Sequence, residues 1–325
     1  MKTSSSFLRR VFVAALTCVA ASGALAQGFH ARPVTIVVPY AVGGTTDIVA
    51  RLVGQQIGNG LGQPLVVDNK TGGAGAIGWG TVARAAPDGY TLLTTEMSMT
   101  VAPALQLQLP FDAKKGFAHI TTAASAPHVL VVNPTVPAKT IQEFIAHAKA
   151  NPGKLNYGSG GNGTNTHLGG ELFKKEAGVS LVHIPYRGAG AVLQDLMGGQ
   201  VQALVTSVPT ALPHIKSGKL RALVVTSVKR SPLLPDVPSA PEAGLPKFLM
   251  DFWVGFAAPA GTPAPIVEQL NKAMVAGVNS EEGKKRLADQ GLVPVGNTPA
   301  AAAQLVQEET QRWGAVVKAA GIKAE

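Results

Sequence analysis

Residues 33–57 read PVTIVVPYAVGGTTDIVARLVGQQI, and this stretch decides the fold class. Pro33 to Tyr40 is mostly apolar, rich in β-branched residues and free of charge, which predicts a buried strand. Gly43 and Gly44 follow in a loop, and apolar residues then recur at every fourth position up to Ile57, which is a helical period. A strand, a glycine-rich loop and a helix in this order predict one unit of a parallel α/β sheet.

The same unit opens the second half of the chain, with a strand at residues 155–157, a glycine-rich loop at 158–163 and a helix at 164–177. Further strands are expected at residues 65–68, 90–95, 129–133, 181–184, 201–206 and 220–226. The proline-rich segment 230–265 suits a hinge or a loop over another lobe, and the helices after it are expected to pack back on the first lobe. Two halves of one design predict two α/β lobes that face each other across a cleft.

The N-terminal segment has the pattern of an export signal. Positive residues open the chain, an apolar run covers residues 11–21, and Ala24-Leu25-Ala26 forms a small-residue cleavage site. The apolar run is too short to span a bilayer, which takes about 20 residues in a helix. Residues 1–26 are therefore expected to be a signal peptide, and the mature protein is expected in the periplasm. Arg9-Arg10 is a weak twin-arginine pattern, so the export route stays open.

Composition narrows the classes of function. The chain's one cysteine, Cys18, lies in the expected signal, so a disulfide or a thiolate nucleophile is not expected in the mature protein. The net charge of the full chain is +9, but its Lys and Arg residues are dispersed and aromatic residues make up 5%, so nucleic-acid binding is not expected. Diffuse positive charge favours the approach of anions, or it serves solubility alone.

Two loops carry the chemistry. In the first, residues 39–47, the glycines allow successive N–H groups to point one way, and the following helix aims its positive end at the same place. Thr45 and Thr46 can cap that helix or donate hydroxyls to a ligand, and Asp47 is expected to stabilise its first turn. The second loop, residues 157–167, has the same design. One such loop is weak evidence, but two in equivalent positions predict that each lobe holds one side of a carboxylate.

Alternative interpretations rest on single motifs. Gly73, Gly75 and Gly78 match G-x-G-x-x-G, with Glu96 at the end of the next strand, which is typical of an NAD-dependent oxidoreductase. Export argues against it, because free nicotinamide cofactor is not expected outside the cytoplasm. Ser159 lacks the G-x-S-x-G elbow of a hydrolase. The histidines lack metal-ligand spacing, so neither a metal nor a cofactor is expected.

Two polar residues keep two interpretations each. His167 follows the second loop on its helix and either contacts ligand or packs inside. Arg187 lies in HIPYRGAG, residues 183–190, and either pairs with a second ligand carboxylate or lies on a surface turn.

Longer stretches resemble the Bug (TctC-like) family of substrate-binding proteins of tripartite tricarboxylate transporters. They are VVPYAVGGTTDIVAR, DNKTGGAGAIGWGTVARAAPDGYTLL, VLVVNP, AKANPGKLNYGSGGNGTNTHLGGELFK, HIPYRGAG, GKLRALVVTS, LPDVPSAPEAG and APAGTP. The resemblance covers nearly all of the mature chain. It implies a type II periplasmic-binding-protein fold, an α/β fold of two lobes with a ligand cleft and two hinge crossovers. The expected division is residues 27–133 with 228–325 in lobe 1 and 134–227 in lobe 2.

The resemblance also implies a function. A small organic carboxylate would be captured by Venus-flytrap closure and passed to the membrane permease subunits of a tripartite transporter, by a monomer that is not an enzyme. The alternative partner is a membrane sensor kinase. The expected ligand-binding residues are Tyr40, Ala41, Val42, Gly43, Gly44, Thr45, Thr46, Glu96, Ser159, Gly160, Gly163, Thr164, His167, Tyr186, Arg187 and Thr206.

Two departures from the family pattern bear on selectivity. Ala41-Val42 stands where many members have Pro-Ala. Glu96 is expected to line the cleft, where it would repel a second ligand acid or bind an amine, which puts a simple dicarboxylate in doubt.

Overall fold

The computed structural model of the protein describes residues 32–61, 64–105, 109, 111–112, 115–320 and 322. The expected signal peptide, residues 1–26, lies outside them. Across the described part of the chain, every helix is too short or too polar to cross a membrane.

Strand β1 (Val34–Val38) is the strand expected at the start of the opening motif, and it lies inside the first of two sheets. It pairs in parallel with β2 (Leu65–Asn69) on one side and β3 (Thr91–Glu96) on the other. The antiparallel strand β9 (Asp251–Pro259) follows β3, and the long β4 (Phe117–Val132) follows β9. The short β10 (Val293–Pro294) adds to β4.

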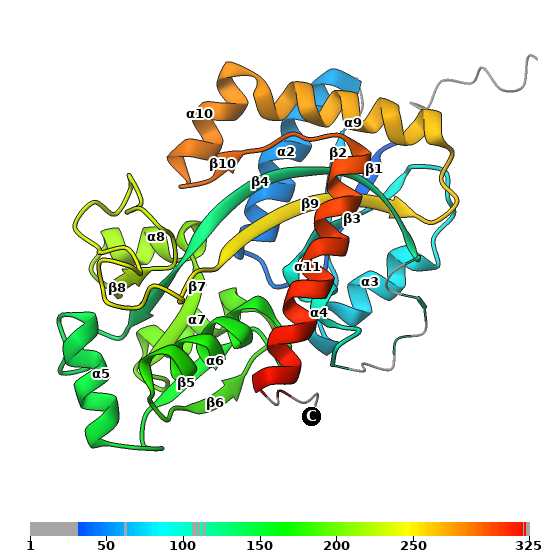
Figure 1. Ribbon diagram of the computed structural model, residues 1–325. Helices are drawn as coiled ribbons and strands as arrows, with labels where there is room; N and C mark the ends of the chain where they lie inside the picture. Colours follow the sequence, from blue (N-terminus) through cyan, green and yellow to red (C-terminus); the bar gives the residue numbers. More distant parts are fainter. Residues whose placement is uncertain are drawn as a thin grey trace, which may run out of the picture.

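The second sheet begins on the far half of β4. Residues 128–132 of β4 pair with β7 (Ala203–Ser207) and β8 (Arg221–Val225). Strand β5 (Asn156–Ser159) lies between β7 and β6 (Val182–Pro185), parallel to both. Strand β4 thus runs through both sheets, and with β9 it links the two halves of the molecule (Figure 1).

Helices cover each sheet and define what we call the first and second lobes. The first lobe holds the first sheet with η2 (Gly73–Gly75), α2 (Thr45–Leu61), α3 (Ala76–Ala83), α4 (Met97–Val101), α9 (Ala264–Asn279), α10 (Glu281–Asp289) and α11 (Pro299–Ala320). The second lobe holds the second sheet with α5 (Ile141–Ala150), α6 (Asn165–Ala177), α7 (Ala189–Met197) and α8 (Val208–Lys216). Helix α9 packs against α2 and helix α11 packs against α4, so the last helices lie on the first lobe as expected.

The expected lobe boundaries, 133/134 and 227/228, stay a prediction, and strand pairing favours slightly different ones. Pro127 of β4 pairs with β9, whereas His128 pairs with β7. The backbone N–H of Met250 donates to Thr226 at 3.0 Å, which closes the segment between β8 and β9 against the second lobe. We propose that the chain crosses between lobes at 127/128 and near 250/251.

The proline-rich segment before β9 packs differently from the expectation of a hinge or a loop over another lobe. Its apolar residues Ala240, Ala243, Leu245 and Phe248 are buried in the hydrophobic core of the second lobe. At these four residues the segment is part of the core, because the apolar side chains between the prolines determine where the irregular backbone packs. The crossing proposed near 250/251 still lies within residues 230–265.

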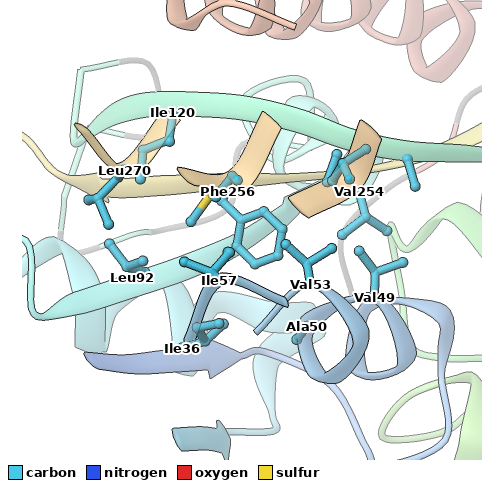
Figure 2. Close-up of a cluster of buried hydrophobic side chains, with 14 of the residues drawn as sticks. Ile36, Val49, Ala50, Val53, Ile57, Leu92, Ile120, Val254, Phe256 and Leu270 are labelled. Atoms are coloured by element: carbon cyan, nitrogen blue, oxygen red, sulfur yellow. The ribbon is translucent and has the colours of Figure 1, made fainter. Parts of the chain in front are cut away.

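The first lobe's core explains why α2 is held in place. Phe256 of β9 lies at the centre of the cluster, against Val53 and Ile57 of α2 (Figure 2). Ile36 of β1 belongs to the same cluster and is fully buried. Each such side chain stabilises the fold by about 1.5–3 kcal/mol when buried. This packing fixes α2 with its N-terminus at the carboxyl end of β1.

Candidate functional site

Four helices begin at one small cavity between the lobes. Helix α2 comes from the first lobe, and α6, α7 and α8 come from the second. The cavity has a volume of about 30 Å³. Its lining residues are Tyr40, Gly44, Thr45, Thr46, Gly160, Thr164, Asn165, Thr166, Gly188, Ala189, Thr206, Ser207, Thr210 and Phe252.

The start of α2 offers backbone donors to the cavity. Gly44 accepts the N–H of Ile48 at 3.0 Å, so Gly44 caps the helix. The N–H groups of Thr45 and Thr46 then have no carbonyl partner within the helix, as is usual in a first turn. The Thr45 hydroxyl is hydrogen-bonded across the cleft to Ser207 and, at 2.9 Å, to Thr210. This corner of the site therefore joins the lobes.

Asp47 was expected to stabilise the first turn of α2, and in the structure it also holds the loop before that helix. Its carboxylate accepts the N–H of Gly43 at 3.1 Å and pairs with Arg51 at 2.9 Å and Asn69 at 3.0 Å. Burial alone would raise the pKa of Asp47, but the hydrogen bonds from Arg51, Gly43 and Asn69 outweigh it and hold the pKa below its usual value. Asp47 is thus ionised, and it holds the loop that precedes α2.

The second loop uses its own backbone donors differently from the expectation. The N–H of Gly160 donates to the Thr166 hydroxyl at 2.7 Å, and that of Gly163 donates to Nδ1 of His167 at 3.0 Å. The Gly161 N–H donates to Ser159 Oγ at 3.1 Å. These amides are occupied within the second lobe, so this loop presents hydroxyls and the helix end to the cavity more than free glycine amides.

Helices α7 and α8 complete the wall on the second lobe. Gly188 and Ala189 lie at the start of α7, and Ser207 precedes α8, whose first turn contains Pro209. A Ser followed by a Pro in the first turn is a helix-start signal, and it follows a strand. At the end of β7 this signal marks the start of α8. The sequence analysis predicted Thr206 of β7 as a site residue but did not predict the helix that follows it.

The electrostatics of the cavity favour an anion. Each helix N-terminus carries the equivalent of roughly half a positive charge. The described lining residues include hydroxyl and amide groups but no Lys, Arg, Asp or Glu side chain. Four positive helix ends with neutral donors between them can bind a carboxylate without a cationic side chain.

Glu96 lies behind this wall and is absent from the cavity lining. Its side chain is 1% exposed and accepts the Tyr40 hydroxyl at 2.5 Å, the Ser98 N–H at 2.9 Å and Nδ2 of Asn165 at 2.8 Å. Burial raises the pKa of Glu96, and burial next to Glu96 also raises the pKa of Tyr40. In this structure Glu96 holds wall residues in place, in contrast to the expected contact with ligand.

His167 packs inside the second lobe, which is the second of its two predicted roles. Its ring stacks on His183, with ring centroids 4.0 Å apart, and burial lowers the pKa of His167 to about 4. Ser159 is fully buried, and its Oγ lies 2.5 Å from Nε2 of His183. Both residues brace the second loop from behind.

The sixteen predicted ligand-binding residues fall into two groups. Seven of them line the cavity: Tyr40, Gly44, Thr45, Thr46, Gly160, Thr164 and Thr206. The others do not: Ala41, Val42, Gly43, Glu96, Ser159, Gly163, His167, Tyr186 and Arg187. Val42 is 64% exposed, Arg187 is exposed, and the Tyr186 hydroxyl donates to Asp195 at 2.7 Å. Asn165, Thr166, Gly188, Ala189, Ser207, Thr210 and Phe252 were missed.

The glycines of the dinucleotide-like motif have packing roles. A Cβ atom at Gly78 would lie 2.7 Å from Cβ of Pro39, and one at Gly75 would lie 2.7 Å from the Trp79 ring. Gly75 also has φ of 108°, which favours glycine. Among the residues that the structure describes, no group of three or more His, Cys, Asp or Glu side chains could hold a metal ion.

Comparisons with known proteins match most of the chain. Residues 49–322 match the family model TctC, described as "Tripartite tricarboxylate transporter family receptor". Protein BugT of Bordetella pertussis is 36% identical over 96% of both chains. The structure of MatC from Rhodopseudomonas palustris with bound malate is similar at a TM-score of 0.84, with 37% identity over 88% of this chain and 99% of that one. R. palustris Rpa4515 with adipate is similar at 0.87, with 35% identity over 90% and 98%.

Proposed function

The chain belongs to the tripartite tricarboxylate transporter receptor family, and from this premise we propose that it is a periplasmic solute-binding protein for a small organic carboxylate. The family match confirms the resemblance to the Bug (TctC-like) proteins, and the structural likenesses confirm the type II periplasmic-binding-protein fold.

One observation carries the proposal of a carboxylate ligand. The N-termini of α2, α6, α7 and α8 converge on a single cavity whose described lining has hydroxyl groups and no charged side chain. A phosphate or sulfate would also suit helix ends. Carboxylates are favoured by the relatives, because MatC was solved with malate and Rpa4515 with adipate.

The size of the cavity supports capture by movement of the lobes. A volume of about 30 Å³ holds one or two water molecules, far less than an organic acid of several carbons. Thr45 meets Ser207 and Thr210 directly across the cleft. Ligand entry therefore requires the lobes to separate, and we propose that they close over the ligand about the crossings in β4 and before β9.

The distal end of the ligand lies away from the helix ends. Phe252 is the large apolar residue of the lining, and Glu96 is not among the lining residues. The second carboxylate of a dicarboxylate would have to bind water or a hydroxyl group near Phe252. Because Glu96 does not line the cavity, the expected repulsion between Glu96 and a second ligand carboxylate no longer argues against a dicarboxylate.

Thermal unfolding of the mature protein, residues 27–325, against a library of mono-, di- and tricarboxylates tests the proposal. A ligand at about a hundredfold excess over its Kd should stabilise the protein by about 2.7 kcal/mol. No stabilisation by any acid would remove its support. A titration of NADH followed by fluorescence, expected to show no binding, tests the oxidoreductase alternative.

The partner that receives the liganded protein is a separate proposal. We propose the permease subunits of a tripartite transporter, following the family description, with a sensor kinase as the alternative. Pull-down of membrane proteins with and without ligand distinguishes them, because recovery of a kinase without permease subunits would contradict transport. The protein is proposed to act as a monomer, which light scattering would check.

A further inference from the structure

Asn165, the first residue of α6, joins three parts of the molecule. Its backbone N–H donates to Ser98 Oγ at 3.0 Å, and its Nδ2 donates to Glu96 Oε2 at 2.8 Å. Its Oδ1 lies 3.3 Å from Nε2 of His128. Glu96 and Ser98 belong to the first lobe, Asn165 to the second, and His128 is the first residue of β4 that pairs with β7. These contacts therefore span the cleft and reach the strand that links the lobes.

The directions of these hydrogen bonds are consistent with one another. The amide nitrogen of Asn165 faces a carboxylate, so its oxygen faces His128, and His128 must carry its proton on Nε2. Burial lowers the pKa of His128 to about 4, so the ring is neutral near pH 7 and one proton on Nε2 suffices. Asn165 thus donates to the first lobe and accepts from the linking strand.

Glu96 connects one wall residue of the cavity from each lobe. Tyr40 of the first lobe and Asn165 of the second both line the cavity, and both donate to the Glu96 carboxylate. Because Glu96 itself lies behind the wall, it acts on the cavity through these two neighbours.

We propose that Asn165 and Glu96 form an interlobe latch, a pair of positioning residues that holds the N-terminus of α6 against the first lobe and thereby sets ligand affinity. The latch rests on the proposed function, capture of a ligand between closing lobes. It makes a contribution separate from the helix ends that bind the anion, since Glu96 offers only acceptors and stands outside the cavity.

An exchange of donor and acceptor tests the latch. Asn165→Asp replaces the donor by a second acceptor against Glu96, so at pH 8 the two carboxylates repel each other in the closed arrangement. An Asp at the start of α6 suits the helix dipole, so the second lobe should fold. The double variant Glu96→Gln/Asn165→Asp removes one of the two charges and restores one donor facing one acceptor, with the direction reversed. The Gln amide nitrogen then also faces the Ser98 N–H, which loses its acceptor, so the recovery is partial. Asn156→Asp, at the start of β5, is the matched control.

The readout is the distance between the lobes. The mature chain is expected to lack cysteine, so spin labels on cysteines introduced at the exposed residues Lys149 and Lys272 report one lobe-to-lobe distance. The distance between the labels is measured for the free protein and with excess malate or adipate. The variants are then compared with the wild type under whichever of these conditions gives the shortest distance in the wild type. Asn165→Asp should lower the closed-to-open ratio about tenfold or more. The double variant should recover part of it, and Asn156→Asp should match the wild type.

A ratio for Asn165→Asp equal to that of the wild type would overturn the latch. So would a double variant no better than Asn165→Asp, because that pattern means that the introduced carboxylate repels the ligand directly or disturbs the fold. If Asn165→Asp fails to fold, Asn165→Ala removes the donor to Glu96 without adding a charge, and a wild-type ratio there overturns the latch. A wild type unmoved by any acid, with Asn165→Asp still opened, would reject ligand capture and leave the latch standing.

Discussion

Gly190, in the first turn of α7, lies where the two lobes approach each other closely. A Cβ atom at Gly190 would lie 2.6 Å from the backbone oxygen of Val42 in the other lobe, while real Cβ contacts essentially never fall below 3.0 Å. Within its own lobe, Gly190 meets no such obstacle and its φ is not positive. We therefore expect Gly190→Ala to weaken ligand binding while the second lobe folds normally.

The magnitude follows from the distances. Moving from 2.6 to 3.0 Å requires the lobes to separate by about 0.4 Å, which would lengthen the 2.9 Å bond between Thr45 and Thr210. Overpacking of this kind costs about 1–3 kcal/mol, which corresponds to a roughly five- to 150-fold loss of affinity. Alanine also favours a helix over glycine by about 1 kcal/mol, so the free energy of unfolding should not fall.

Isothermal titration calorimetry with an acid that binds the wild type measures this loss. Gly198→Ala is the matched control, because it lies at the other end of α7 and its nearest atom, Gln194 O, would be 3.5 Å away. Wild-type affinity in Gly190→Ala, or an equal loss in both variants, would refute the proposed closure.

Three further predictions concern the supports of the site. The free energy of unfolding should fall as the pH is lowered from 6.5 to 4, by at most about 1.4 kcal/mol per pH unit for each buried histidine. The pKa values of His119, His128 and His167 near 4 lie below the unfolded value, so the unfolded chain binds more protons in this window. Urea unfolding of the wild type and of His167→Gln measures this: the variant should show a shallower slope, and equal slopes would contradict the prediction. Asp47→Asn should lower stability at pH 7 by about 1–3 kcal/mol, with the difference from wild type vanishing as the pH falls through the lowered pKa of Asp47, and an undiminished difference at low pH would be inconsistent with this assignment. Phe256→Ala should lower stability by about 3–5 kcal/mol in the same assay, and a loss under 1 kcal/mol would show that the first core is not centred there.

The opening motif could be predicted from local pattern. Apolar β-branched residues give β1, and the fourfold period from Val49 through Val53 to Ile57 gives the buried face of α2. Both features depend on neighbours in the chain, so periodicity is sufficient to read them. The last helices were expected to pack back on the first lobe, and α9 packs against α2 and α11 against α4.

The roles of Glu96 and His167 depended on contacts that periodicity does not report. Glu96 accepts a hydrogen bond from Asn165, 69 residues later in the chain. Through this contact Glu96 holds a lining residue of the cavity in place, whereas the sequence predicted that Glu96 itself lines the cleft. His167 stacks on His183 from a neighbouring strand, which decides between its two interpretations. The start of α8 differs from these two cases, because its signal is local. Ser207 with Pro209 two residues later is a helix-start pattern that can be read from the sequence alone.

We propose that four helix N-termini select an anionic carboxylate through neutral donors. Calorimetric titration of the mature protein with malate and adipate, each beside its neutral diamide of nearly the same shape, tests it most directly. We predict binding of at least one of the two acids and no measurable binding of its diamide, since the helix ends attract the negative charge that the amide lacks. Equal affinity for an acid and its diamide would contradict the claim.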